Sequence, residues 1–204
     1  MINLFIDTSY KSLFIGLTDN EKMIDEICIM AEANFSEKLI PILKEIMEKN
    51  NVRLDDINKI FVTIGPGSFT GIRIGVTVCK ILGFALNTKI VPLSSLEFMA
   101  TTMVDTDYII PFIDARHDMV FAGVYDSNGK NVIEDSYCNM NELTKKVNGS
   151  ITFVSYDNIG IENTVVPNYD VFKIIKNHLQ DTGLSYHEIN PNYLKKTEAE
   201  ERLV

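Results

Sequence analysis

One order of strands and helices occurs twice in this chain of 204 residues, and this repetition limits the folds that the chain can adopt. The first copy has three strands, a helix, a strand, a long helix and a strand, at residues 2–6, 12–18, 22–30, 36–50, 59–64, 68–86 and 89–91. The second copy repeats this order at residues 108–113, 119–125, 130–138, 141–147, 151–154 and 169–180, after a connecting helix at 94–103. Two mixed sheets, each covered by helices, are therefore predicted. The alternative is a chance recurrence within one α/β domain.

An aspartate ends the first strand of each copy, Asp7 in the first and Asp114 in the second. This order resembles the actin/sugar-kinase/Hsp70 (ASKHA) fold, a duplicated two-domain α/β fold with mixed sheets. The resemblance implies that both aspartates face a cleft between the domains, where nucleotide and metal bind. We expect an N-terminal domain over residues 1–103, and a smaller C-terminal domain with its tail over residues 104–204.

The cleft lacks the glycines that nucleotide-binding relatives of this fold place directly after the first aspartate. Thr8 and Ser9 follow Asp7 here. We therefore expect a vestigial nucleotide cleft at Asp7, Thr8, Ser9 and Asp114, with no catalytic residue, no metal and no cofactor of its own. Weak binding of ATP or ADP within a complex is still allowed. The alternative is a small ASKHA-fold ATPase or kinase that binds ATP-Mg between Asp7 and Asp114.

The motif Gly-Pro-Gly-Ser-Phe-Thr-Gly-Ile-Arg-Ile-Gly occupies residues 65–75, between a strand and the long helix. Its first three residues predict a sharp turn, and Ser68 is a suitable N-cap. Gly71 and Gly75 each cost the helix about 1 kcal/mol relative to alanine, which suggests that something approaches its backbone closely. A dinucleotide-binding loop is disfavoured. Its pattern is Gly-x-Gly-x-x-Gly, and the third glycine here, Gly71, lies one residue beyond the position that this pattern requires.

Small residues line one side of the long helix at four-residue spacing, and bulky apolar residues line the other. We expect the bulky side to pack on the sheet and the small side to meet a second protein chain. The alternative is that the helix is buried within its own domain. The predicted partner interface consists of Leu39, Leu43, Phe69, Gly71, Ile72, Arg73, Gly75, Val76 and Cys79.

The composition indicates a cytoplasmic protein with no membrane segment. The formal net charge is -9, which argues against a subunit that binds RNA on its own. Three scattered cysteines suit a reducing compartment, and residues 1–7 lack the features of a signal peptide. The apolar run at 72–86 contains Arg73 and Lys80 and is expected to be too short to span a bilayer.

The motif at 65–75 is very similar to the signature of the TsaB (YeaZ) family. Four other segments resemble that family in the same order along the chain: Ile6-Asp7-Thr8-Ser9, Leu39-Ile40-Pro41, Ile113-Asp114-Ala115-Arg116 and Pro191-Asn192-Tyr193-Leu194-Lys195. Lys195 stands where relatives have arginine. The His-x-x-x-His pair of the catalytic paralogue TsaD is absent, because the three histidines are His117, His178 and His187.

The resemblance implies a non-catalytic subunit in the synthesis of threonylcarbamoyladenosine, the modified adenosine beside the anticodon of certain tRNAs. It implies a heterodimer with the transferase TsaD, formed through the helices of the first domain, and contact with the ATPase TsaE. Contact with tRNA would be indirect, through the complex. The same surface would form a homodimer when the chain is alone. A metallopeptidase is a more distant alternative.

Overall fold

The computed structural model describes residues 1–30 and 34–195, which form two compact units. The first unit combines Met1–Phe98 with Asp170–Pro191. The second unit consists of Met99–Tyr169 and the segment that begins at Asn192. This division differs from the expected boundary after residue 103, because residues 170–191 leave the second half of the sequence and pack on the first unit.

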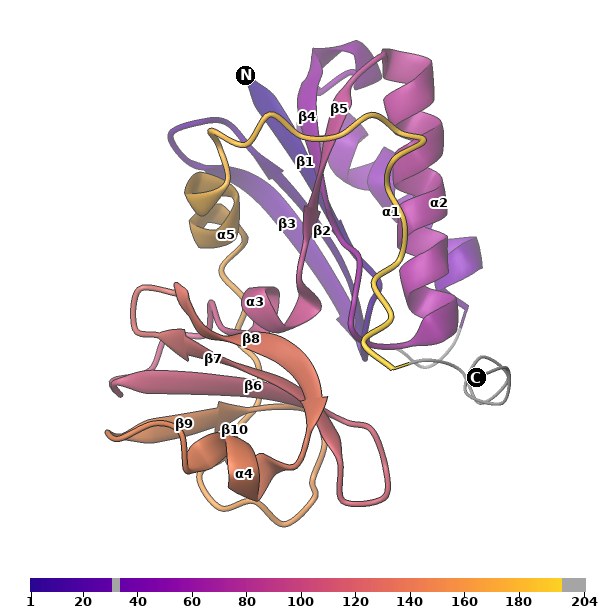
Figure 1. Ribbon diagram of the computed structural model, residues 1–204. Helices are drawn as coiled ribbons and strands as arrows, with labels where there is room; N and C mark the ends of the chain where they lie inside the picture. The colour runs from indigo at the N-terminus through magenta and orange to yellow at the C-terminus, as the bar shows by residue number, and fades with distance from the viewer. Residues whose placement is uncertain (31–33, 196–204) are drawn as a thin grey trace. The chain divides into compact units, whose positions relative to one another are not determined.

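The sheet of the first unit has the strand order β3-β2-β1-β4-β5 (Figure 1). Its strands are β1 (Ile2–Asp7), β2 (Ser12–Thr18), β3 (Met23–Met30), β4 (Ile57–Thr63) and β5 (Lys89–Leu93). The central strand β1 pairs antiparallel with β2 and parallel with β4. Nearly all side chains of β1 and β2 are buried, as expected for strands that are covered on both faces.

The second unit repeats this strand topology, which confirms the predicted duplication of the sheet, but the helix predicted at 169–180 for the second copy belongs to the first unit. Its sheet order is β10-β9-β6-β7-β8, and β6 pairs antiparallel with β7 and parallel with β9. The elements are β6 (Tyr108–Asp114), β7 (Val120–Asp126), β8 (Asn131–Cys138), α4 (Met140–Thr144), β9 (Ile151–Val154) and β10 (Thr164–Val165). Strand β10 was not predicted, because two residues give no periodic pattern. The connecting helix α3 (Ser95–Met99) is shorter than expected.

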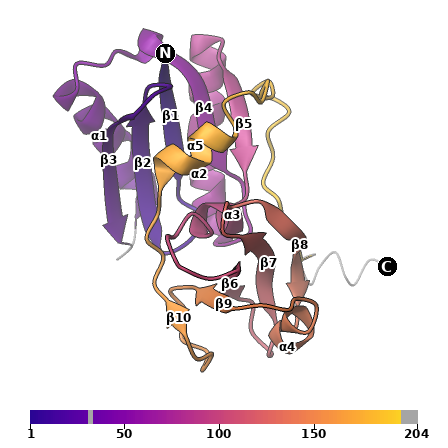
Figure 2. The same cartoon turned by 90° about the vertical axis from the view of Figure 1, so that its left-hand side faces the viewer.

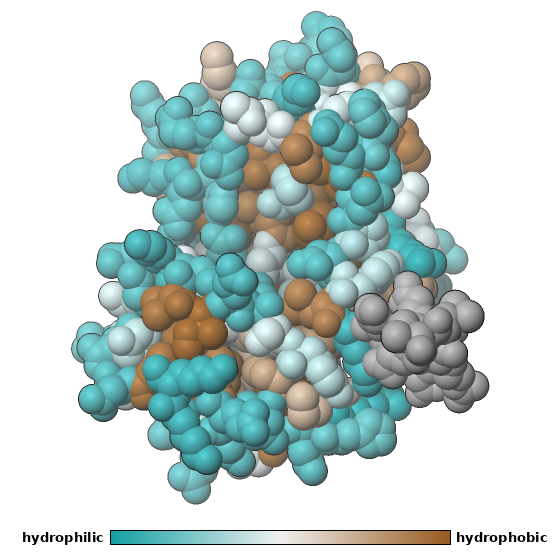
Figure 3. Space-filling model, in the orientation of Figure 1, coloured by the Kyte–Doolittle hydropathy of each residue, from teal (hydrophilic) through white to brown (hydrophobic). Residues whose placement is uncertain are grey.

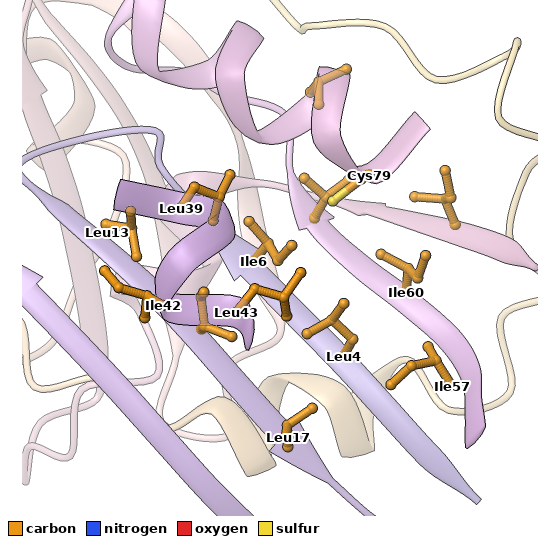
Figure 4. Packing of buried hydrophobic residues seen from close by; sticks show 14 of the residues in the cluster. Leu4, Ile6, Leu13, Leu17, Leu39, Ile42, Leu43, Ile57, Ile60 and Cys79 are labelled. Atoms are coloured by element: carbon orange, nitrogen blue, oxygen red, sulfur yellow. The ribbon is translucent and has the colours of Figure 1, made fainter. Parts of the chain in front are cut away.

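Helices α1 (Phe35–Lys49) and α2 (Phe69–Leu86) cover one face of the first sheet, and α5 (Val171–Asn177) covers the other (Figures 1 and 2). Alternate residues of β1 and β2 form a dry core with the helices α1 and α2 (Figure 4). On the opposite face, Gly16 makes room for α5, since an added Cβ would lie 2.7 Å from Cγ1 of Val171. This contact explains why α5 belongs to the first unit.

Residues 178–190, here called the return strap, continue from α5 around the edge of the first sheet (Figure 1). Lys59 Nζ donates to two carbonyl oxygens near the start of the strap, both at 2.7 Å. Leu184 pairs with Ile90 of β5, and Ile189 is buried in the core shared with α2. The strap therefore protects the β5 edge from pairing with another chain.

In Figure 3, apolar side chains gather over the sheet of the first unit and are surrounded by hydrophilic ones.

His178 fixes the start of the strap through two carboxylates. Its Nε2 lies 2.7 Å from Oε1 of Glu97, and its Nδ1 lies 2.7 Å from Oδ2 of Asp181. The hydrogen bond with Glu97, together with the attraction of both carboxylates, raises the pKa of His178 to about 9 despite partial burial. The imidazolium form is therefore the one that the folded state stabilises.

We expect His178→Gln to lower the free energy of unfolding by ~1–3 kcal/mol near neutral pH, because Glu97 and Asp181 lose a charged donor. The folded-state pKa of His178 lies above the unfolded value of 6.5. The stabilisation of the folded state by the charged imidazole is therefore complete below about pH 6.5 and is lost as the pH rises through about 9. Urea denaturation at about pH 6 and about pH 10 measures the difference. His187→Gln is the control, and an equal loss at both pH values would contradict the expectation.

Candidate functional site

The loop before α2 is attached to the turn between β1 and β2. The backbone N–H of Ser68 donates to the carbonyl oxygen of Ser9 at 2.6 Å. A Cβ on Gly67 would lie 2.0 Å from the same oxygen, so only glycine fits there. Ser68 also accepts from the backbone N–H of Gly71 at 3.2 Å, which confirms it as the N-cap of α2. The motif therefore joins strand, turn and helix inside one unit.

Gly71 and Gly75 also face this turn, and the prediction that they meet a second chain is wrong. The Thr8 hydroxyl donates to the carbonyl oxygen of Gly71 at 2.6 Å and accepts from the N–H of Gly75 at 3.1 Å. An added Cβ would lie 2.1 Å from the carbonyl oxygen of Thr8 at Gly71, and 2.5 Å from its Oγ1 at Gly75. The backbone that approaches the helix is the chain's own, so the alternative of burial within the domain is correct for this side.

Most of the other predicted interface residues are buried as well. The buried side of α2 includes Ile72, Val76 and Cys79, which have exposed fractions of 1%, 3% and 0%. Leu39 and Leu43 of α1 lie in the same core. The physical reason is that α1 and α2 must cover one face of the sheet, and these are the positions that do so. Burial raises the pKa of the Cys79 thiol well above its usual range, so this cysteine is unreactive.

The exposed side of α2 combines large apolar side chains with an arginine and a threonine. We call it the outer face of α2 and define it by Phe69, Arg73, Thr77, Ile81 and Phe84. Phe69, Ile81 and Phe84 have exposed fractions of 45%, 61% and 66%. The Arg73 guanidinium lies over the Phe69 ring at 3.7 Å, so its charge sits at one end of this surface.

Sequence reasoning assigned the bulky side of α2 to the sheet and therefore missed Ile81 and Phe84. A signal was available, because Arg73, Thr77 and Lys80 fall on the bulky side at spacings of four and three residues. A charged or hydroxyl-bearing stripe marks the side of a helix that is not in the core. Phe69 and Arg73 are the two predicted interface residues that the structure leaves on the outer face.

A groove of about 450 Å³ runs along the outer face toward α1. Its lining includes Phe69, Arg73, Ile74 and Val78, with Ser36 on the α1 side.

By length and composition α2 could cross a membrane, since it has 18 residues with a mean hydropathy of 1.6. This criterion applies to the 18 residues Phe69–Leu86 and not to the shorter run at 72–86, and the core helix of a soluble protein meets it as well.

Asp7 is buried at the end of β1 and its Oδ1 is used within the first unit. This oxygen accepts hydrogen bonds from the backbone and hydroxyl of Ser9, at 2.9 and 2.5 Å, and from the hydroxyl of Thr63. Burial raises the pKa of Asp7, and these hydrogen bonds act in the opposite direction. Thr8 and Ser9 are buried too, so the three predicted cleft residues of this unit hold the turn in place.

Asp114 has the equivalent position at the end of β6, but its surroundings differ. Its side chain is exposed, and Oδ1 accepts a hydrogen bond from the backbone N–H of Arg116 at 2.8 Å. Its own backbone N–H donates to Asp157 at 2.8 Å. Within residues 1–30 and 34–195, no three side chains of His, Cys, Asp or Glu come together as a metal site.

Comparisons with known proteins agree with this architecture. The model of the family "TsaD: tRNA N6-adenosine threonylcarbamoyltransferase" matches residues 29–166. The tRNA threonylcarbamoyladenosine biosynthesis protein TsaB of Bacillus subtilis is 34% identical over 164 residues, which cover 77% of this chain and 72% of that protein. YeaZ from Pseudomonas aeruginosa has a TM-score of 0.73 at 20% identity. A protein described as similar to peptidase YeaZ from Pseudomonas aeruginosa has a TM-score of 0.81 at 18% identity. Each of these two structural matches covers 95% of this chain and 99% of the solved chain.

The fold and the site define a duplicated ASKHA-type protein, whose glycine motif attaches a helix to its own first unit and leaves the apolar side of that helix exposed. Within this class the sequence comparisons are specific. The chain belongs to the TsaB (YeaZ) family.

Proposed function

We propose that this chain acts in the biosynthesis of threonylcarbamoyladenosine in tRNA, as a non-catalytic partner subunit of TsaD. The names of its relatives support the pathway, and the match of residues 29–166 to the TsaD family supports a paralogous partner. In this proposal the cytoplasmic complex also includes TsaE and reaches tRNA through TsaD. The chain forms a homodimer when TsaD is absent, and it needs no metal or cofactor of its own.

The single observation that carries the partner role is the outer face of α2. Three large apolar side chains on one helix, Phe69, Ile81 and Phe84, are each 45% exposed or more. Large exposed apolar side chains gathered on one helix face are typical of an interaction site in a soluble protein. Aromatic and arginine side chains are also the residues that most often dominate binding energy in protein interfaces.

The internal use of Asp7 supports an accessory role over the ATPase or kinase alternative. Oδ1 of Asp7 already accepts hydrogen bonds from Ser9 and Thr63, and a carboxylate that binds Mg²⁺ needs its lone pairs for the ion or its water ligands. The turn that would face a nucleotide is also filled by the contact between Thr8 and α2. Both features belong to the first unit alone.

A reconstituted modification assay tests the proposal. TsaD, TsaE, the threonylcarbamoyl donor and substrate tRNA are incubated with and without this chain, and the modified adenosine is quantified under multiple turnover. We expect sustained turnover only when the chain is present. Full turnover by TsaD and TsaE alone would overturn the proposal. Calorimetric titration of the isolated chain with ATP and Mg²⁺ separates this role from the kinase alternative, which requires tight binding that is lost in Asp7→Asn.

A further inference from the structure

The outer face of α2 is too small to form a stable interface by itself. Phe69, Ile81 and Phe84 together expose roughly 350 Å² of apolar surface, if each whole side chain offers about 200 Å². Each partner in a standard protein interface buries about 800 Å². The surface that meets a partner must therefore extend onto the elements beside this face.

The return strap is one of these elements, since it lies beside the C-terminal half of α2 and runs in the opposite direction (Figure 1). The ring centroid of Tyr186 lies 5.2 Å from that of Phe84, and Lys80 Nζ donates to the carbonyl oxygen of Ile189 at 2.9 Å. Phe84 remains 66% exposed despite its contact with the strap. The strap therefore adjoins the outer face of α2 and does not cover it.

Tyr186 and His187 continue the exposed surface along the strap. Tyr186 is 36% exposed, and the side chain of His187 is exposed as well. Their ring centroids are 5.2 Å apart with an interplanar angle of 88°, and the angle between the rings of Phe84 and Tyr186 is 67°. Edge-to-face contacts of this kind are favourable for aromatic rings. The three rings form a row, here called the aromatic row, that passes from the helix to the strap.

Hydrogen bonds hold the turn of the strap that carries this row. Oγ of Ser185 lies 3.0 Å from Nδ1 of His187, and the backbone N–H of Ser185 donates to Oε2 of Glu188 at 2.9 Å. The backbone N–H of Glu188 donates to the carbonyl oxygen of Ser185 at 3.0 Å. On the two sides of this turn, Leu184 pairs with β5 and Ile189 is buried. A surface that is ordered before binding loses less conformational entropy in a complex.

From this continuity we infer that the surface that binds TsaD extends from the outer face of α2 onto the strap, with Tyr186 as an anchor residue. The inference rests on the proposed partner role and adds the kind of surface that TsaD must present there. That surface is an apolar recess for the Tyr186 ring, bordered by a polar group that hydrogen-bonds to its hydroxyl. Within residues 1–30 and 34–195 this hydroxyl makes no hydrogen bond. Tyrosine is enriched in interfaces because it combines a large ring with such a polar end.

Calorimetric titration of the full chain with TsaD tests the inference. Tyr186→Ala should weaken binding about 30-fold, because an exposed aromatic anchor is removed. Tyr186→Phe keeps the ring and should weaken binding about fivefold or less, by the loss of one hydrogen bond. Val132→Ala is the matched control, since Val132 is a 48% exposed apolar side chain of the second unit, and it should bind as the original chain does. The urea midpoints of all three variants should stay close to that of the original chain.

Two further measurements separate direct contact by Tyr186 from mere support of Phe84. Phe84→Ala should weaken binding, and adding Tyr186→Ala to it should weaken binding again on the order of tenfold if Tyr186 contacts TsaD itself. An unchanged affinity on adding the second substitution would contradict the inference. In the unmodified chain, backbone hydrogen exchange over residues 184–188 should slow when TsaD is added, which does not depend on the folding of any variant.

The outcomes distinguish this inference from the proposed function. If Ile81→Glu loses TsaD but Tyr186→Ala binds it with unchanged affinity, the inference is wrong and the partner role stands. Unchanged affinity in Ile81→Glu overturns the partner surface and its extension together. If Tyr186→Ala loses only the association of the chain with itself, the strap belongs to a contact with a second copy, and the inference is again wrong.

Discussion

Replacing Ile81 by glutamate is expected to weaken the complex with TsaD on the order of 100-fold. Ile81 is 61% exposed on the outer face of α2, and a glutamate there would bury an unpaired charge in the contact. The stability of the free chain should stay within about 0.5 kcal/mol, because the side chain points away from the core. Calorimetry or co-elution with TsaD on a sizing column measures the loss, and the reconstituted modification activity should fall with it.

Val166→Glu is the matched control for this prediction. Val166 is 64% exposed, but it lies in the second unit, outside any surface proposed to meet TsaD. The control should leave both affinity and activity unchanged. If Ile81→Glu also binds TsaD with unchanged affinity, the outer face of α2 is not the partner surface and the proposed contact must be moved elsewhere.

Replacing Gly71 by alanine is expected to destabilise the first unit by about 3 kcal/mol or more. The new Cβ would lie 2.1 Å from the carbonyl oxygen of Thr8, and a backbone atom cannot move aside as the end of a flexible side chain can. The cost comes from forcing α2 away from the turn between β1 and β2. Urea denaturation followed by circular dichroism measures the fall in the denaturation midpoint.

Thr77→Ala provides the comparison on the same helix. Thr77 is exposed, and alanine has the better helix propensity, so this variant should change stability by no more than about 0.5 kcal/mol. A Gly71→Ala variant of unchanged stability that fails only to bind TsaD would restore the idea that the small side of α2 faces a partner. Loss of both properties together is what burial of Gly71 predicts.

The fold could be predicted from the sequence because its signals are local and occur twice. Strands β2 and β9 have the predicted bounds, and the repeated order of strands predicts both sheets. The return of residues 170–191 to the first unit could not be predicted in the same way. It depends on contacts between residues that are far apart in the sequence, such as Val171 and Gly16. Nothing in the sequence around either residue indicates that the two are in contact.

The orientation of α2 shows where sequence reasoning about the site failed. A stripe of glycines predicts the close approach of another backbone, but it does not say to which chain that backbone belongs. The approach is made by Thr8, a residue 63 positions from Gly71, through hydrogen bonds that periodicity cannot reveal. The pair of carboxylates around His178 was missed for the same reason, since Glu97 and Asp181 are near only after the strap has folded.

The return strap also determines the order in which the two units can complete their folding during translation. The continuous part of the second unit, Met99–Tyr169, leaves the exit tunnel before the last piece of the first unit, Asp170–Pro191, can emerge. Until then the nascent first sheet lacks its cover over β5 and over Gly16, and its border is open to wrong pairing. The half of the protein that is made first therefore stays incomplete until most of the other half has been made.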